Sequence, residues 1–187
     1  MKLLRLIVLF AIMAFTTKTK TLVKPLKTKK SPTHSIESSN LKLSKIKIRD
    51  LNLFLEVVGQ KESSNRYHVV NRFGYMGRYQ FSIKTLKGLG IKTSKKKFLS
   101  NPKLQDSAMI LLLKHNKNRL QKVIDRYEGK YIKGILITES GMLAAAHLAG
   151  PGRVKGFLRR GKDFQDGFGT KMTSYLNQFG GYYLNLK

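Results

Sequence analysis

The chain has 187 residues, of which 37 are Lys or Arg and 10 are Asp or Glu, so its formal net charge is +27. This length suits one folded domain, and a hydrophobic share of 41% is enough to form a core. The absence of cysteine excludes disulfides, thiolate metal sites and a lipid-modified cysteine. Stability must therefore come from packing.

The first residues have the pattern of a secretory signal peptide. Lys2 and Arg5 precede an uncharged apolar run over residues 6–15, which is shorter than the roughly 20 residues of a membrane-spanning helix. We predict a signal peptide over residues 1–16, export to the periplasm, cell envelope or medium, and no stable membrane span after cleavage. An uncleaved N-terminal anchor is the alternative, because no clean small-x-small cleavage site lies near Ala14.

Residues 17–47 are rich in Lys, Thr and Ser and lack apolar periodicity, which predicts a flexible basic tether before a folded domain over residues 48–187. The high positive charge requires polyanionic surroundings. Predicted export argues against nucleic acid, and the sequence contains no arginine-rich recognition helix, zinc site or RNA-binding aromatic signature. An anionic cell envelope, bound through the lysine-rich surface, is therefore the preferred partner.

The folded part begins with a predicted helix that Asp50 caps and that ends at 62–64, where Ser-Ser-Asn favours a turn. The apolar face of this helix carries Leu51, Phe54, Leu55, Val57 and Val58. Residues 67–81 are too irregular to decide between strand and loop. Ser82 then caps a short helix that runs through Leu86 to Leu89.

Asn101-Pro102 starts a long helix that remains apolar on one face until Gly129 and that could break at His115-Asn116. Its apolar face carries Leu104, Ala108, Leu111, Leu112, Leu120, Val123, Ile124 and Tyr127. Thr138 caps a helix whose residues 142–149 are apolar on all sides, which indicates burial at the centre of the fold. A turn or helix over 152–158 and a last helix over 170–179 complete a mainly helical domain.

The ten acidic residues allow a census of possible proton donors. Eight fall in the tether, on exposed faces or ends of the long helix, in first turns of helices, or in a Gly/Lys-rich loop. These eight are Glu37, Asp50, Asp106, Asp125, Glu128, Glu139, Asp163 and Asp166. Glu56 and Glu62 remain beside the polar, aromatic segment, and Glu56 could equally lie on the helix surface. Glu62 is the better candidate acid, the alternative being an ordinary solvated residue at a helix end.

Four ordered segments carry a family resemblance: Glu62-Ser63, Gly77-Arg78-Tyr79-Gln80, 145–154 and 173–176. They resemble the motifs of soluble lytic transglycosylases and goose-type lysozymes, which have Glu-Ser, Gly-Leu-Met-Gln, Ala-Tyr-Asn-Ala-Gly with a following glycine, and a late tyrosine. The resemblance spans roughly residues 50 to 180. Arg78-Tyr79 departs from Leu-Met, and His147-Leu148 departs from Tyr-Asn.

The resemblance implies a lysozyme-like fold, mainly α with a small loop or hairpin wall beside the catalytic helix, and no cofactor. It also implies cleavage of peptidoglycan between N-acetylmuramic acid and N-acetylglucosamine, with Glu62 as the single general acid/base. Glu62 would then act as base on the muramoyl 6-hydroxyl, giving a 1,6-anhydro product, or on a water, giving hydrolysis. The substrate's N-acetyl group would assist in place of a second carboxylate.

The residues expected to bind substrate share a polar or aromatic character, or a place in the four segments. They are Ser63, Asn65, Tyr67, Asn71, Tyr75, Gly77, Tyr79, Gln80, His147 and Tyr175. Tyrosine hydroxyls prefer a wet edge, whereas Phe73 and Phe81 are expected in the core or packed in loops. Asn65 and Asn71 could equally bind N-acetyl groups or form turns.

His147 could contact sugar or the glutamate, although a core position is common for histidine in an alanine-rich helix. The four histidines lack paired ligand spacing, so no metal site is predicted. A non-catalytic peptidoglycan-binding protein is the first alternative function. A basic nucleic-acid-binding protein is the remote one.

Overall fold

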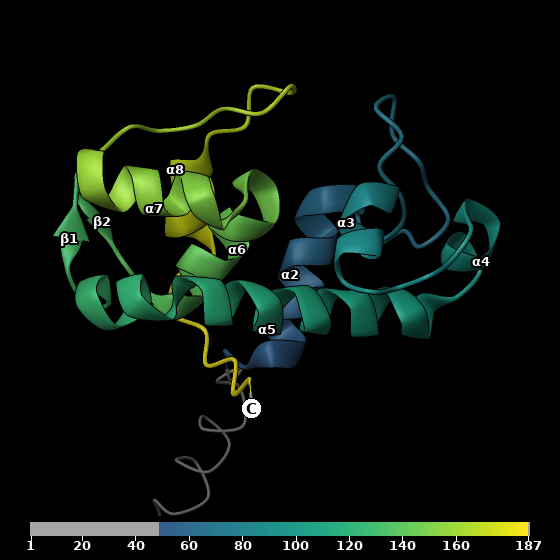
Figure 1. Ribbon diagram of the computed structural model, residues 1–187, viewed down its shortest axis with the longest axis horizontal. Coiled ribbons are helices and arrows are strands. Elements are labelled where there is room, and N and C mark those ends of the chain that lie inside the picture. Colours follow the sequence, from purple (N-terminus) through teal and green to yellow (C-terminus); the bar gives the residue numbers. More distant parts are fainter. Residues whose placement is uncertain (1–48, 187) are drawn as a thin grey trace, which may run out of the picture. The chain divides into compact units, whose positions relative to one another are not determined.

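The computed structural model describes residues 49–186, which are mainly helical, as predicted (Figure 1). The predicted signal peptide, the whole of the predicted tether and its boundary with the domain lie outside the described residues. The helices are α2 (Leu51–Ser63), α3 (Ile83–Gly88), α4 (Lys95–Leu99), α5 (Pro102–Tyr127), α6 (Glu139–Ala149), α7 (Pro151–Arg160) and α8 (Met172–Gln178). Strands β1 (Tyr131–Ile132) and β2 (Ile135–Leu136) form an antiparallel hairpin, with Tyr131 opposite Leu136.

Capping side chains set the starts of four helices where the sequence predicted them. Asp50, Ser82, Asn101 and Thr138 each accept a hydrogen bond from the backbone N–H three residues further on. Each bond satisfies a donor that the first helical turn leaves unpaired. These four predicted helix starts are confirmed.

Two elements were not predicted. Helix α4 is capped by Ser94, but its five residues include only two apolar side chains and give no periodicity. The hairpin is equally short, and its turn places Lys133 and Gly134 at φ 49° and 76°. Left-handed residues of this kind suit a tight hairpin turn.

Helix α5 runs unbroken for 26 residues, so the break considered at His115-Asn116 is wrong. The buried face continues through this position, because Leu113, Asn116 and Leu120 are all at most 2% exposed. Leu111 is 40% exposed, contrary to its predicted place on the apolar face. It lies two residues from both Met109 and Leu113, which is about 200° around a helix and therefore on the opposite side.

Helix α6 is the centre of the core, as predicted from its apolar surface. Residues 140–146 are buried without interruption, and the helix packs against α5, α7 and α8. Gly141 allows the close approach of α8, because a Cβ there would lie 2.5 Å from the backbone oxygen of Leu176. This approach brings Tyr175, the neighbour of Leu176, toward α2.

Helix α5 is the element that the two halves of the domain share (Figure 1). Helices α6, α7, α8 and the hairpin lie along its C-terminal half, whereas α3 and α4 lie beside its N-terminal half. Helix α2 stands between the two groups. Two loops, over residues 71–75 and 162–170, extend on the side away from α5. The C-terminal end of α2 is thus positioned between the two groups.

Candidate functional site

Glu62 lies in the last turn of α2, next to an abrupt change of chain direction. Ser64 and Asn65 adopt left-handed backbone angles, with φ 55° and 59°. The Glu62 side chain is only 14% exposed. It is therefore largely enclosed, unlike an ordinary solvated residue at a helix end.

Tyr175 of α8 is the hydrogen-bond partner of Glu62. Its hydroxyl donates to Glu62 Oε1 at 2.6 Å. Burial raises the pKa of Tyr175, and the neighbouring Glu62 charge raises it further. The phenol consequently remains a donor throughout the neutral range. No hydrogen bond within residues 49–186 uses Glu62 Oε2.

His147 of α6 faces the same carboxyl. Its Nε2 lies 3.7 Å from Glu62 Oε1, and its side chain is 8% exposed. Its Nδ1 is buried without a hydrogen-bond partner among the described residues. This environment differs from that of a core histidine with both ring nitrogens satisfied, since the ring is directed at Glu62.

A cavity of about 300 Å³ opens in front of Glu62. Its size is at the lower end of the range for small-molecule sites. It is lined by residues of α2, α6, the two loops and the segment just before α3: Glu62, Asn71, Phe73, Tyr75, Gln80, His147, Leu148, Asp166, Gly167 and Phe168. Five of the predicted site residues, Glu62, Asn71, Tyr75, Gln80 and His147, therefore line one cavity.

Tyr67 and Tyr79 do not line this cavity, which corrects their predicted place at its wet edge. Both donate to the carboxylate of Asp106, Tyr67 at 3.1 Å and Tyr79 at 2.9 Å. Asp106 also pairs with Arg78 at 3.1 Å. Asp106 is therefore not an exposed helix residue but the acceptor of a partly buried network, and this network holds the two tyrosines away from the cavity.

Ser63, Asn65 and Gly77 also lie outside the lining and support its walls instead. Ser63 Oγ donates to the backbone oxygen of Arg78 at 2.9 Å, and Asn65 Oδ1 accepts from Arg78 Nε at 2.8 Å. Gly77 has φ 73°, and a Cβ there would overlap the buried side-chain oxygen of Gln105. Together these contacts join the end of α2 to the loop that precedes α3. Arg78, one of the residues at which the sequence departs from the motifs that it resembles, is the common partner of Ser63 and Asn65.

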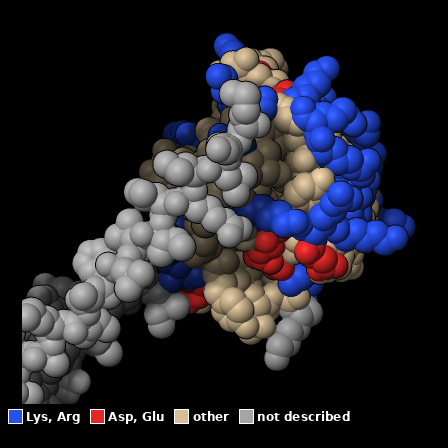
Figure 2. All heavy atoms as spheres, turned by 90° about the vertical axis from the view of Figure 1, so that its left-hand side faces the viewer, with Lys and Arg blue, Asp and Glu red and all other residues tan. Residues whose placement is uncertain are grey.

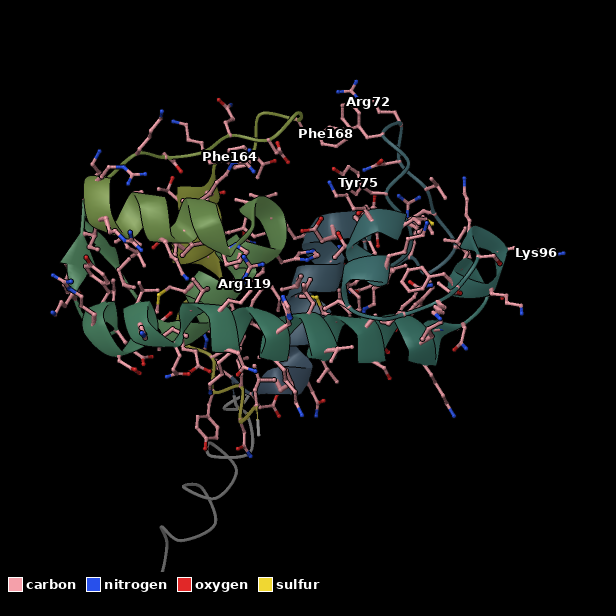
Figure 3. The ribbon with its side chains drawn as sticks, viewed as in Figure 1. Arg72, Tyr75, Lys96, Arg119, Phe164 and Phe168 are labelled. Carbon is pink, nitrogen blue, oxygen red and sulfur yellow. The ribbon has the colours of Figure 1, made fainter. Side chains whose placement is uncertain are left out.

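Of the two positions predicted for Phe73, the core is wrong and packing between loops is confirmed, because Phe73 is 52% exposed and its ring contacts that of Phe168 beside the cavity. Its ring meets that of Phe168 edge-on, with centroids 4.7 Å apart. The Arg72 guanidinium lies 5.0 Å and 4.9 Å from the two ring centroids. Figure 3 shows Arg72 and Phe168 near the tips of two loops that face each other above Tyr75. By contrast, Phe81 is 1% exposed, as expected.

The sequence contained one sign of the exposed Phe73. Asn71 Oδ1 accepts the backbone N–H groups of Phe73 and Tyr75, and Gly74 has φ 82°. An asparagine followed three residues later by glycine favours a tight surface turn, which would carry Phe73 at its tip. Asn71 therefore forms a turn and lines the cavity as well.

Asp166 is a second carboxyl at the cavity, although its place in a Gly/Lys-rich loop did not predict it as a site residue. Its Oδ1 accepts the backbone N–H groups of Phe168 at 2.9 Å and Thr170 at 2.7 Å. Its charge also contributes to the raised pKa of Tyr175. An Asp-Gly pair in a glycine-rich loop indicates a turn, so nothing in its local sequence marked it as a site residue.

The lining of this cavity includes two carboxyls and no Lys or Arg. Among residues 49–186, no three His, Asp or Glu side chains come close enough together to hold a metal ion. In the same part of the chain, no helix is both long and apolar enough to cross a membrane. The site is thus built from carboxyl, phenol, imidazole, amide and aromatic groups.

The molecular surface is strongly basic at the end that holds the hairpin. Figure 2 shows Lys and Arg side chains gathered over a large part of that view, with few Asp or Glu among them. Exposed basic residues in the elements at this end are Lys122, Arg126, Lys130, Lys133, Arg159, Arg160 and Lys162.

Comparison of the chain with protein-family models, with curated proteins and with solved structures found no match.

Proposed function

We propose that this protein is an exported peptidoglycan-cleaving enzyme with a lysozyme-like domain, in which Glu62 is the single general acid/base. The observation that carries the proposal is the convergence of four distant segments. Glu62, Gln80 and His147 line one cavity, and Tyr175 hydrogen-bonds to Glu62 from 113 residues further along the chain. These are the four segments on which the family resemblance depends.

The geometry suits transfer of one proton at a glycosidic bond. Tyr175 holds Oε1, so we assign the proton transfer to Oε2. In the first step Glu62 donates its proton to the leaving oxygen while the bond from that oxygen to the muramoyl C1 breaks, and the substrate's N-acetyl oxygen supports the developing positive charge. The Glu62 carboxylate then removes a proton from the muramoyl 6-hydroxyl or from a water that attacks C1. The first course gives a 1,6-anhydro end and the second a reducing end.

The lining of the cavity supports sugar binding. Tyr75, Phe73 and Phe168 offer exposed aromatic surface, while Gln80 and Asn71 provide amide groups beside it. Apolar rings with a few polar groups are the usual composition of a ligand site. The basic surface and the predicted tether would keep the enzyme at an anionic envelope.

Digestion of purified cell-wall sacculi tests the proposal. Wild type and Glu62→Gln should be compared with Glu56→Gln, a matched change on the same helix that lies outside the cavity. We expect wild type and Glu56→Gln to release muropeptides, and Glu62→Gln to release them at least about a hundredfold more slowly. Mass spectrometry of the released ends distinguishes anhydro from reducing products. Equal release by all three proteins would refute the role of Glu62.

A non-catalytic peptidoglycan-binding protein is the second candidate. Leu148 favours it, because this apolar side chain lines the cavity where the resembling family has an asparagine. Binding of wild type to sacculi without any release of fragments would support this function. Equal, salt-sensitive retention on DNA and on sacculi would instead favour the nucleic-acid-binding alternative.

A further inference from the structure

A second cavity of about 460 Å³ adjoins the first. The two share Tyr75, Gln80, His147 and Leu148 in their linings, so they lie next to each other. The rest of the second cavity is contributed by α3, the middle of α5, and the junction of α6 with α7. A ligand that reaches Glu62 can therefore extend into it.

The two cavities differ in the ionisable side chains that line them. Glu62 and Asp166 line the first, which has no Lys or Arg in its lining. Arg119 and His115 line the second, and no Asp or Glu does so among the described residues. Figure 3 shows Arg119 on α5, facing the space between the two groups of helices. The second cavity is consequently suited to an anionic group.

A buried amide in the second cavity lacks a partner. Asn116 is 2% exposed, and its Nδ2 has no hydrogen-bond partner among residues 49–186. His147 Nδ1 is the other such atom in that part of the chain, and His147 lines the same cavity. Buried donors are normally paired, because an unpaired one lowers stability. An acceptor supplied by a ligand would satisfy Asn116.

The start of α7 adds to this environment. Gly150 and Pro151 line the second cavity, and no side chain caps this ten-residue helix. Pro151 has no N–H and Arg153 N–H donates to the backbone oxygen of Gly150, so the helix dipole and the N–H of Gly152 are what favour negative charge nearby. Arg119, Asn116 and the start of α7 therefore offer three kinds of group that stabilise an oxyanion.

We propose that the second cavity binds a carboxylate of the acidic peptide stem attached to muramic acid beside the cleaved bond. The inference rests on the proposed function and specifies its substrate: glycan that still carries peptide. Arg119 would pair with the carboxylate through two N–H groups, and Asn116 would donate a hydrogen bond to the same peptide stem. Glycan stripped of its stems would leave this cavity unused.

Binding of soluble glycan fragments, with and without stems, tests this assignment in the Glu62→Gln background. We expect stem-bearing fragments to bind about tenfold more tightly or better. Arg119→Gln should remove that advantage and leave stem-free binding unchanged. Arg126→Gln is the matched control, since this exposed arginine on the same helix lines neither cavity. No stem advantage, or equal weakening of both fragments by Arg119→Gln, would overturn the inference.

A titration with the free dipeptide N-acetyl-L-alanyl-D-glutamate separates this inference from the proposed function. We expect the Asn116 side-chain amide resonances to shift with the dipeptide in the otherwise unaltered protein, and to shift less in Arg119→Gln. Such shifts in a protein that leaves sacculi intact would support the carboxylate site and refute the proposed cleavage of peptidoglycan. Cleavage of sacculi without such shifts would support the enzyme and refute the carboxylate site. Equal shifts with inorganic phosphate at the same concentration would refute the preference for a carboxylate.

Discussion

The hydroxyl of Tyr175 donates a 2.6 Å hydrogen bond to the carboxyl of Glu62, which lies on another helix 113 residues earlier. This bond joins α8 to α2 and fixes the oxygen of Glu62 that faces away from the proposed proton transfer. It also connects the packing of the core with the chemistry of the cavity, because Tyr175 is 3% exposed and belongs to the core.

Tyr175→Phe removes this hydrogen bond and preserves the ring. A hydrogen bond to a charged group contributes about 1.5–3 kcal/mol to stability, so we expect the unfolding free energy to fall by up to about that amount. We also expect the catalytic rate on sacculi to fall about tenfold or more, because Glu62 Oε1 loses the group that positions it. The measurements are initial rates of muropeptide release and thermal unfolding. Tyr183→Phe is the control, because Tyr183 is 74% exposed. Full activity of Tyr175→Phe would show that the bond has no part in turnover.

The raised pKa values of buried tyrosines predict a loss of stability at high pH. Burial raises the pKa of both Tyr79 and Tyr175 above the ordinary value of 10.0. The unfolded chain therefore loses these protons first, so the stability that the two protonated phenols contribute is complete below pH 10 and falls as pH rises above it. Each group should contribute a slope of about 1.4 kcal/mol per pH unit in that range.

Denaturant unfolding from pH 8 to 12 measures this slope. Lysines also titrate in this range, so the comparison that isolates the tyrosines is wild type against Tyr79→Phe and Tyr175→Phe. Each variant should lose stability less steeply above pH 10. Parallel curves for all three proteins would contradict the assignment.

Asp106→Ala tests the network that holds the loop before α3. Asp106 accepts from Tyr67 and Tyr79 and pairs with Arg78, whose side chain is 14% exposed. Removing the carboxylate leaves the buried Tyr79 hydroxyl without its acceptor and Arg78 without its ion pair, and we expect a loss of about 2 kcal/mol of unfolding free energy. The control is Asp125→Ala, an exposed change on the same helix, which should stay within about 0.5 kcal/mol. If both variants lose only a little unfolding free energy, water replaces the Asp106 carboxylate as acceptor and the prediction is wrong.

The sequence predicted the helices well wherever a cap and an apolar face coincided. Asp50, Ser82, Asn101 and Thr138 each carry both signals, and each starts a helix. Helix α4 and the hairpin are too short for periodicity to appear, and the Ser94 cap and the Lys133-Gly134 turn do not predict them without it. The sequence pattern was therefore enough to predict the four capped helices, whereas α4 and the hairpin became apparent only in the structure.

The site was predicted less completely, because side-chain direction depends on distant partners. Nothing near Tyr79 in the sequence indicates that its hydroxyl donates a hydrogen bond to Asp106, 27 residues later. Likewise, Asp166 and Phe168 reach the cavity only because their loop crosses toward residues 71–75. The resemblance identified Glu62 and Tyr175, but the cavity between the loops required the structure.

Gly141→Ala tests whether the close approach of α6 and α8 maintains the site. A Cβ at Gly141 would lie 2.5 Å from the backbone oxygen of Leu176, so α8 must shift. We expect a loss of about 1–3 kcal/mol in unfolding free energy, with reduced activity because Tyr175 moves with α8. Gly152→Ala, in open space on α7, should be neutral or stabilising by up to about 1 kcal/mol. If Gly141→Ala is less stable but keeps full activity, the close approach of the two helices contributes to stability and does not maintain the site.

Phe168→Ala tests the aromatic contact above the cavity. Phe168 and Phe73 line the cavity and touch each other, whereas neither contacts Glu62 in a hydrogen bond or ring interaction among the described residues. Loss of ring surface should therefore weaken substrate binding more than the chemical step. We expect KM on soluble glycan fragments to rise about tenfold with kcat changed less than threefold, because aromatic contacts contribute about 0.5–1.5 kcal/mol beyond the area that they bury.

The exposed Tyr131, at 73% exposure, provides a matched control as Tyr131→Ala. The alternative role for the Phe73–Phe168 contact is to restrict entry of long strands. In that case Phe168→Ala would raise the rate on intact sacculi while leaving KM for short fragments unchanged, which is the opposite pattern. A fall in kcat at constant KM would contradict both roles, because it would require Phe168 to act on the transition state that Glu62 serves.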